Sequence, residues 1–91
     1  MEEKKDMQKV AVRIFDEEYI VKGNEQAEYM EMLAAYVDKR MRMISQRNKY
    51  LSATKVAVLT ALNLADDLNK LQEDYDELVK MIEEDKKNKK E

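Results

Sequence analysis

The sequence predicts an α+β fold that is mostly helical, in which an N-terminal β-hairpin and a helix form a small head before a long coiled-coil helix. Three observations predict this fold. Apolar residues alternate over residues 9–15, an apolar stripe with helical spacing follows over 30–44, and a seam of apolar residues runs from 57 to 82. The 91 residues include no proline and one glycine, so long uninterrupted helices are expected.

The first element is a pair of strands predicted over about 9–15 and 19–22. Alternate residues from Val10 to Ile14 are β-branched and share one face, which is typical of a strand. The acidic residues 16–18 between the two runs predict the turn. Because a two-stranded ribbon is marginally stable in water, the hairpin must pack on helices or pair with a second copy.

A helix is predicted next over about 25–47, with Asn24 as its N-cap after a break at Gly23. Acidic residues lie near its start and basic residues toward its end, the order that the helix dipole favours. Its apolar stripe predicts a face packed in the core rather than a ligand pocket. The stripe consists of Met30, Leu33, Ala34, Val37, Met41 and Ile44, and is widened by Tyr29, Met32, Tyr36 and Met43.

The last helix is predicted to begin at Ala53, after an N-cap at Ser52, and to continue to about residue 85. Its length of about 50 Å exceeds the radius of gyration of about 12 Å expected for a compact domain of this size, so it must project from the head. Its apolar residues step by alternating fours and threes, the pattern of a coiled-coil seam. The seam consists of Ala57, Ala61, Leu64, Leu68, Leu71, Tyr75, Leu78 and Ile82. An exposed seam would promote aggregation, so a homodimer is expected.

The two ends of the chain and the upper part of the last helix complete the predicted organisation. Within Val56–Ala65 apolar residues occupy nearly the whole circumference, which predicts that this stretch is buried on all sides, where the helix passes through the head and contacts the hairpin, the preceding helix and the dimer mate. We therefore divide the chain into a flexible tail at 1–8, a head at 9–63, a coiled-coil stem at 64–85 and a disordered charged tail at 86–91.

Composition argues against catalysis. The chain has no His, Cys or Trp, so Ser–His and Cys nucleophiles and His/Cys metal sites are excluded, and neither Ser45 nor Ser52 has an imidazole to activate it. Asp74 and Asp76 are better explained as solvated carboxylates on a helix than as a calcium loop. We predict no enzyme activity, no cofactor and no metal site.

The sequence also predicts a soluble cytoplasmic protein that does not bind a membrane. The N-terminus does not have the pattern of a secretory signal. The longest uncharged run has ten residues, whereas a membrane-spanning helix needs about 20.

Charge is unevenly distributed along the chain, whose formal net charge is −3. Residues 39–55 carry six of the 17 basic residues and no acid. The basic cluster, as we call its candidate binding residues, consists of Lys39, Arg40, Arg42, Arg47 and Lys49. These charges could contact an acidic protein surface, bind phosphates of a nucleic acid, or simply be solvated at a helix end. Two observations argue against nucleic-acid binding. The rest of the chain is acidic, and no helix has the pattern of a recognition helix that contacts bases. A coiled-coil adaptor for another partner also remains an alternative.

Several segments, in order along the chain, resemble the ZapA family of bacterial cell-division proteins. Ala61–Leu68 is similar to that family's Ala-Leu-Asn-Ile-Ala-Asp-Glu-Leu segment. Val10–Phe15 followed by Tyr19–Val21 resembles its opening hairpin, and Leu51–Leu59 resembles its entry into the long helix. The resemblance covers about residues 9–82.

The resemblance implies a non-enzymatic protein that forms dimers, with tetramers in longer members. It also implies binding to polymers of the tubulin-like protein FtsZ and bundling of its filaments at midcell. The basic cluster is our candidate FtsZ-binding surface. Two departures stand out: Asp16 and Glu17 follow Phe15 where many members have Gly and then a basic residue, and the stem is short.

Overall fold

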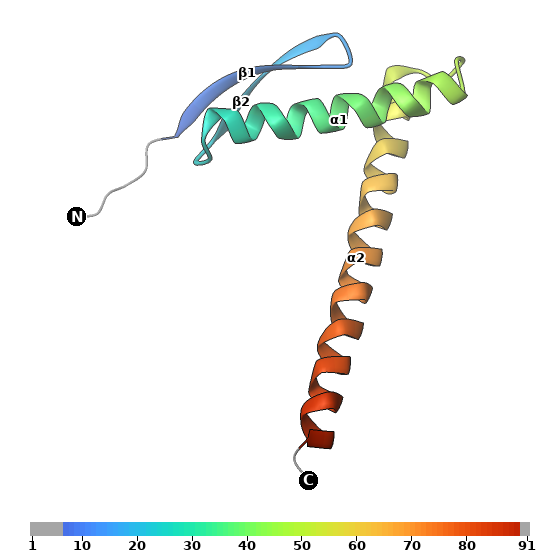
Figure 1. Ribbon diagram of the computed structural model, residues 1–91. Coiled ribbons are helices and arrows are strands. Elements are labelled where there is room, and N and C mark those ends of the chain that lie inside the picture. Colours follow the sequence, from blue (N-terminus) through green and yellow to red (C-terminus); the bar gives the residue numbers. More distant parts are fainter. Residues whose placement is uncertain (1–6, 90–91) are drawn as a thin grey trace, which may run out of the picture. The chain divides into compact units, whose positions relative to one another are not determined.

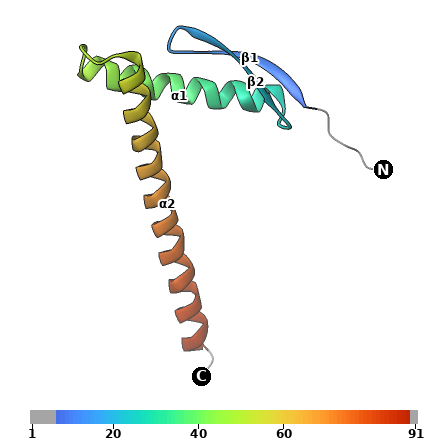
Figure 2. The ribbon, with the colours of Figure 1, turned by 180° about the vertical axis from the view of Figure 1, so that it is seen from behind.

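The computed structural model describes residues 7–89, which form two strands and two helices (Figures 1 and 2). In chain order these are β1 (Gln8–Ile14), β2 (Glu17–Gly23), α1 (Ala27–Arg47) and α2 (Ala53–Lys89). The chain divides into two compact units after Thr60. The first unit contains the hairpin, α1 and the first two turns of α2, and the second contains the rest of α2. The α+β, mostly helical fold class predicted from the sequence is confirmed.

β1 and β2 form an antiparallel hairpin in which Val10 lies opposite Val21 and Ala11 opposite Ile20. Only two residues connect the strands. Phe15 and Asp16 both have positive φ, at 53° and 70°. Left-handed conformations at both central positions are the feature of a type I′ turn, which matches the twist of the flanking strands.

The observed turn differs from the one predicted at residues 16–18. The strands span 8–14 and 17–23 instead of 9–15 and 19–22, so Gln8, which was assigned to the flexible tail, is in β1. The rest of that predicted tail, apart from Met7, lies outside the described residues. The prediction failed because a two-residue turn of this type normally contains Gly or Asn, whereas here its first residue is Phe15, an aromatic residue that seldom adopts positive φ.

The core of the first unit lies between β1 and α1. Val10 and Val12 from the strand meet Met30 and Ala34 from the helix, and each of the four is only 6–7% exposed. The alternation put Val10, Val12 and Ile14 on one face of the strand, and the structure shows that this face of β1 is the one that packs on α1. Partly buried apolar residues surround this cluster: Ile14, Val21 and Ala27. In both views α1 runs along the hairpin (Figures 1 and 2).

The start of α1 differs from the prediction of an Asn24 cap. The N-cap residue is Gln26, and its side chain makes no capping bond. Its backbone carbonyl instead accepts the N–H groups of Tyr29 and Met30, at 3.1 Å each. The helix begins later than predicted because β2 continues to Gly23, which leaves Asn24 and the next residue to form the bend between the elements.

The start of α2 agrees with the sequence. The Oγ of Ser52 accepts the N–H of Lys55 at 3.2 Å, which confirms Ser52 as the N-cap. Val56 is completely buried, and Thr60 is buried beside it. The Thr60 hydroxyl donates to the Val56 carbonyl at 2.8 Å, so its burial leaves no unsatisfied polar group.

Within one chain the apolar stretch of α2 is buried on one side, so the hairpin and α1 do not supply the cover predicted for its other sides. Val58, Leu59 and Leu62 are 61%, 41% and 66% exposed. Only the side of the helix that carries Val56 and Thr60 is packed. A pattern of apolar residues does not show whether these side chains are buried within one chain or against another chain.

The C-terminal end of α2 also corrects a prediction. Residues 86–91 were assigned to a disordered tail, but the helix continues to Lys89, and residues 90–91 lie outside the described range. Lysine has good helix propensity, and positive charge at a helix C-terminus is favoured by the dipole. No helix in residues 7–89 is both long enough and apolar enough to span a membrane.

Candidate interaction surfaces

The hairpin turn is tied to α1 by a set of contacts that we call the turn network, formed by Phe15, Asp16, Asp38 and Arg42. The backbone N–H of Phe15 donates to Asp38 Oδ1 at 2.7 Å. Arg42 donates through Nε to Asp38 Oδ2 and through Nη2 to Asp16 Oδ1, at 2.9 Å in both cases. The Arg42 guanidinium also lies 5.7 Å from the centre of the Phe15 ring. One carboxylate and one guanidinium thus join both turn residues to the helix.

The charges of the turn network stabilise one another. The hydrogen bond from Arg42 and then that from the Phe15 N–H lower the pKa of Asp38. The Asp38 hydrogen bond, reinforced by Asp16, raises the pKa of Arg42. Both groups are therefore held in their charged forms, and the Asp38 carboxylate is ionised over the whole neutral range.

This arrangement predicts a contribution to stability that is lost in acid. The folded pKa of Asp38 lies below its unfolded value of about 3.9, so the stabilisation is fully present above that value and disappears as the pH falls through the folded pKa. Thermal unfolding of the parent chain and of Asp38→Asn should be compared between about pH 6 and 2. We expect the difference between their midpoint temperatures to become smaller as the pH falls below about 4. A gap that stayed constant over this range would contradict the prediction, and Glu31→Gln on the same helix is the matched control.

The structure separates the members of the basic cluster. Arg42 is engaged in the turn network, and Arg40 donates to the Tyr36 hydroxyl at 3.1 Å and lies over its ring. Lys39, Arg47 and Lys49 are exposed. Arg47 occupies the last turn of α1, where its charge also complements the helix dipole.

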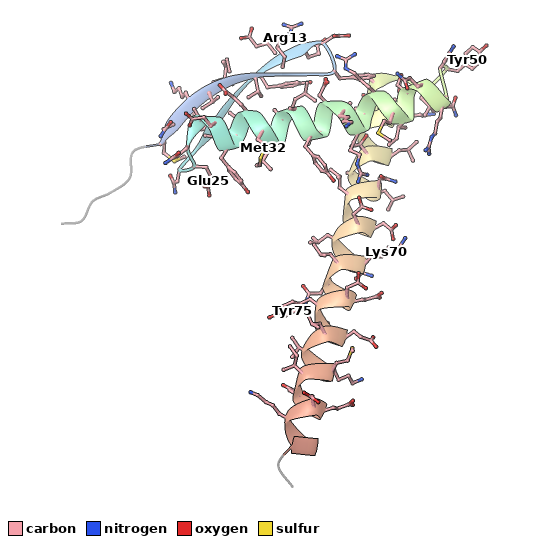
Figure 3. All side chains as sticks on the ribbon, in the orientation of Figure 1. Arg13, Glu25, Met32, Tyr50, Lys70 and Tyr75 are labelled. Carbon is pink, nitrogen blue, oxygen red and sulfur yellow. The ribbon has the colours of Figure 1, made fainter. Side chains whose placement is uncertain are left out.

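An exposed aromatic residue accompanies the basic cluster and was not singled out from the sequence. Tyr50, in the connection between α1 and α2, is 98% exposed (Figure 3). It follows Lys49 directly and lies three residues after Arg47. Tyrosine and arginine are enriched among the residues that dominate binding energy at protein interfaces. The loss of helical periodicity at 47–51 was the available signal, but it could not show that the ring is in solvent.

The apolar stripe of α1 is only partly in the core. Met30, Ala34 and Met41 are buried, whereas Leu33 is 43% exposed. The residues that widen the stripe, which were predicted as core, are also exposed: Tyr29, Met32, Tyr36 and Met43. Met32 points away from the hairpin (Figure 3). The first unit therefore carries an exposed face of aromatic and methionine side chains on the side of α1 opposite its core.

A groove of about 870 Å³ lies between β2 and the first turns of α2. Its lining includes Tyr19 and Val21 from the hairpin, Met41 from α1, and Ala57 and Val58 from α2. The groove exists because α1 covers the sheet mainly over β1, which leaves the inner face of β2 open.

In the second unit, the predicted seam continues along α2 from Ala61 to Ile82. Leu68, Leu71, Tyr75, Leu78 and Ile82 are between 50% and 67% exposed. Other faces of the helix carry charged pairs, such as Lys70 with Asp66 at 2.9 Å, and Lys70 and Tyr75 point to different sides (Figure 3). Such pairs four residues apart support a helix without any partner.

The described residues hold no constellation suited to metal binding. Across 7–89, no group of three or more acidic, His or Cys side chains is placed to bind an ion. Asp76 accepts a hydrogen bond from Gln72 at 3.1 Å, as a solvated carboxylate on a helix would.

Comparison with known proteins identifies the family. Residues 10–90 match the family model described as "Cell division protein ZapA". The chain belongs to the ZapA family. It is 40% identical over 78 residues to the cell division protein ZapA of Geobacillus thermodenitrificans, a match that covers 86% of each chain. It is 43% identical over 72 residues to ZapA of Halalkalibacterium halodurans, covering 79% of each chain.

Solved structures agree with the ZapA assignment. A structure described as "ZapA mutant dimer from Geobacillus stearothermophilus" is similar with a TM-score of 0.70 and 34% identity, over 91% of this chain and 95% of that one. A conserved Pseudomonas aeruginosa PAO1 protein of unknown function gives the same TM-score at 32% identity, over 84% and 85% of the two chains. The family resemblance found in the sequence is thus confirmed, and it places the chain among cell-division proteins.

Proposed function

We propose that this ZapA-family chain is a non-enzymatic, homodimeric division protein that binds FtsZ polymers and links neighbouring filaments at midcell in the cytoplasm. Family membership over residues 10–90 is the observation that carries the proposal. The resemblance of the sequence to that family implies the FtsZ partner. The exposed seam, groove and basic cluster supply the means of association that such a role requires.

The seam of α2 supports self-association. Five of its residues from Leu68 to Ile82 are at least half exposed in one chain, and leaving them in water would be unfavourable. Each large apolar side chain that a second helix covers contributes about 1.5–3 kcal/mol. A relative in this family has been solved as a dimer. We therefore assign the seam to the dimer interface of the stem.

A symmetric dimer carries two copies of the binding surface. When the partner is a polymer with many equivalent sites, the second contact of a bound dimer forms at a high effective concentration. Two weak sites on one molecule can then hold two filaments together. Linking filaments in this way needs no catalytic group and no cofactor.

We assign the contact with FtsZ to the exposed part of the basic cluster, Lys39, Arg47 and Lys49, with Tyr50 as an apolar anchor. These charges are accessible, whereas Arg42 is occupied by the turn network. Positive charge would steer the chain toward an acidic partner surface, and a central tyrosine would supply buried contact area. Binding is then expected to weaken as salt is added.

Co-sedimentation with FtsZ polymers in the presence of GTP tests this assignment. We expect the double substitution Arg47→Glu with Lys49→Glu to weaken binding at least about tenfold, because juxtaposed like charges cost several kcal/mol. The control is Lys80→Glu with Lys86→Glu, which changes the net charge equally but at exposed positions of α2. Unchanged pelleting of the first variant would exclude this surface. Arg42 is unsuitable for the test because its reversal would also break the turn network.

A further inference from the structure

Apolar burial constrains the hairpin strongly on β1 but only weakly on β2. β1 has one clearly buried face, but on β2 the adjacent residues Tyr19 and Ile20 point to opposite faces and are 49% and 61% exposed. Moving β2 by one residue would exchange its two faces, because side chains alternate along a strand. Such a move would turn Ile20 inward in place of Tyr19 and Val21, and would also bring Lys22 to the inner face of β2, which α1 leaves open.

A competing turn exists in the sequence. A three-residue turn over 16–18 would place Phe15 opposite Tyr19 and Ile14 opposite Ile20. Ile14 now pairs with Glu17, so this turn would shift β2 by three residues and, like a move of one residue, would exchange its two faces to give the flipped register. The observed turn instead requires positive φ at Phe15 and Asp16, and neither is glycine. Local residue preference therefore does not favour the register that the chain adopts.

The turn network favours the observed register over the flipped register. In the observed register, Phe15 is a turn residue and its N–H is directed to Asp38 Oδ1 at 2.7 Å. In the flipped register, Phe15 would pair with β2 next to the turn and its N–H would be used within the hairpin. The bond from Asp38 is thus compatible only with the observed register. Arg42 fixes the Asp38 carboxylate and also holds Asp16.

We propose that Asp38, held by Arg42, is a positioning residue that selects the register of the hairpin and so decides which side chains of β2 face the interior. The consequence reaches the groove, since Tyr19, Ile20 and Val21 all contribute to its lining and a flip would reverse the face on which each of them lies. A residue of α1 that is 23 positions away from Phe15 would in this way control an interaction surface on the opposite strand. This role is independent of the identity of the binding partner.

Disulfide trapping can measure the register, because the chain contains no cysteine. Ala11 and Ile20 lie directly opposite each other and both are exposed. In a two-residue hairpin they form a non-hydrogen-bonded pair, the closer type, which suits a disulfide. The probe is the full chain with Ala11→Cys and Ile20→Cys, equilibrated with a glutathione buffer, with intrachain disulfide quantified by mass spectrometry and helix content checked by circular dichroism.

We expect Asp38→Asn to lower the effective concentration of the two thiols by about tenfold or more, the effect of losing a charge-assisted hydrogen bond. Glu31→Gln, on the same helix, is expected to leave it unchanged. Undiminished disulfide formation in the folded Asp38→Asn chain would overturn the proposal.

A second variant separates register selection from general stability. Phe15→Asn with Asp16→Gly builds a turn whose residues adopt positive φ by themselves. In that background, Asp38→Asn is expected to have little effect on disulfide formation. An equally large loss with the Asn-Gly turn would show that Asp38 acts on the stability of the head instead, and the proposal would fail.

Discussion

Leu71→Glu is expected to convert the dimer into a monomer at micromolar concentration. Leu71 occupies a central position of the seam and is 66% exposed within one chain, so in the proposed interface a second helix would cover it. Each dimer loses two leucines, at about 1.5–3 kcal/mol each, and gains two charges that would be buried unpaired. Since about 1.4 kcal/mol is tenfold in affinity, the dissociation constant should rise roughly a thousandfold or more.

Light scattering coupled to size-exclusion chromatography gives the mass of both forms directly. Lys80→Glu is the matched control, because it introduces the same residue on the same helix at a position outside the seam. That variant should retain the parental mass. A Leu71→Glu chain with the parental mass would show that the seam is not the interface and that the exposed faces of the first unit hold the dimer together.

Val56→Ala is expected to destabilise the first unit by about 2–3 kcal/mol, measured by urea denaturation. Val56 is the most deeply buried side chain among residues 7–89, with no exposed surface, so its truncation removes contacts and leaves a cavity. This decrease is a large fraction of the free energy of unfolding of a small domain, because such a domain has a small core.

Lys55→Ala provides the control for this substitution. It removes more atoms from the neighbouring residue, but those atoms are in solvent, so the free energy of unfolding should change by no more than about 0.5 kcal/mol. Equal effects of the two substitutions would contradict the packing of the first turns of α2 within the head unit.

Regular patterns in the sequence predicted the elements that depend on local physics. Alternation over β1 put Val10 and Val12 on one face, which is the buried face in the structure, and Ser52 was recognisable as an N-cap from its residue type and position. The fold class followed from these signals, because a two-residue period followed by helical periods leaves few alternatives.

The turn could not be predicted, because it depends on contacts between residues that are distant in the sequence. Phe15 and Asp16 have no strong preference for positive φ, and the bond that supports them comes from Asp38 on the next helix. For the same reason the sequence could not show that Arg42 is occupied by the turn network. A run of basic residues indicates charge, but the structure is needed to show which charges are available to a partner.

The solvent exposure of apolar side chains also could not be predicted from the apolar periodicity of the sequence. Apolar spacing marked Tyr36 and Leu62 as buried, yet both are exposed within one chain. Periodicity indicates that a face is apolar and says nothing about which molecule covers it. Residues of this kind mark surfaces that are available for association.

The central claim is that a dimer of this ZapA-family chain binds FtsZ polymers and links them. Its most direct test is pelleting and 90° light scattering of FtsZ assembled with GTP, with and without the purified chain. We expect the chain to enter the pellet with the polymer and the scattering to rise well above that of FtsZ alone. A chain that stays in the supernatant and leaves the scattering unchanged would contradict the proposed function.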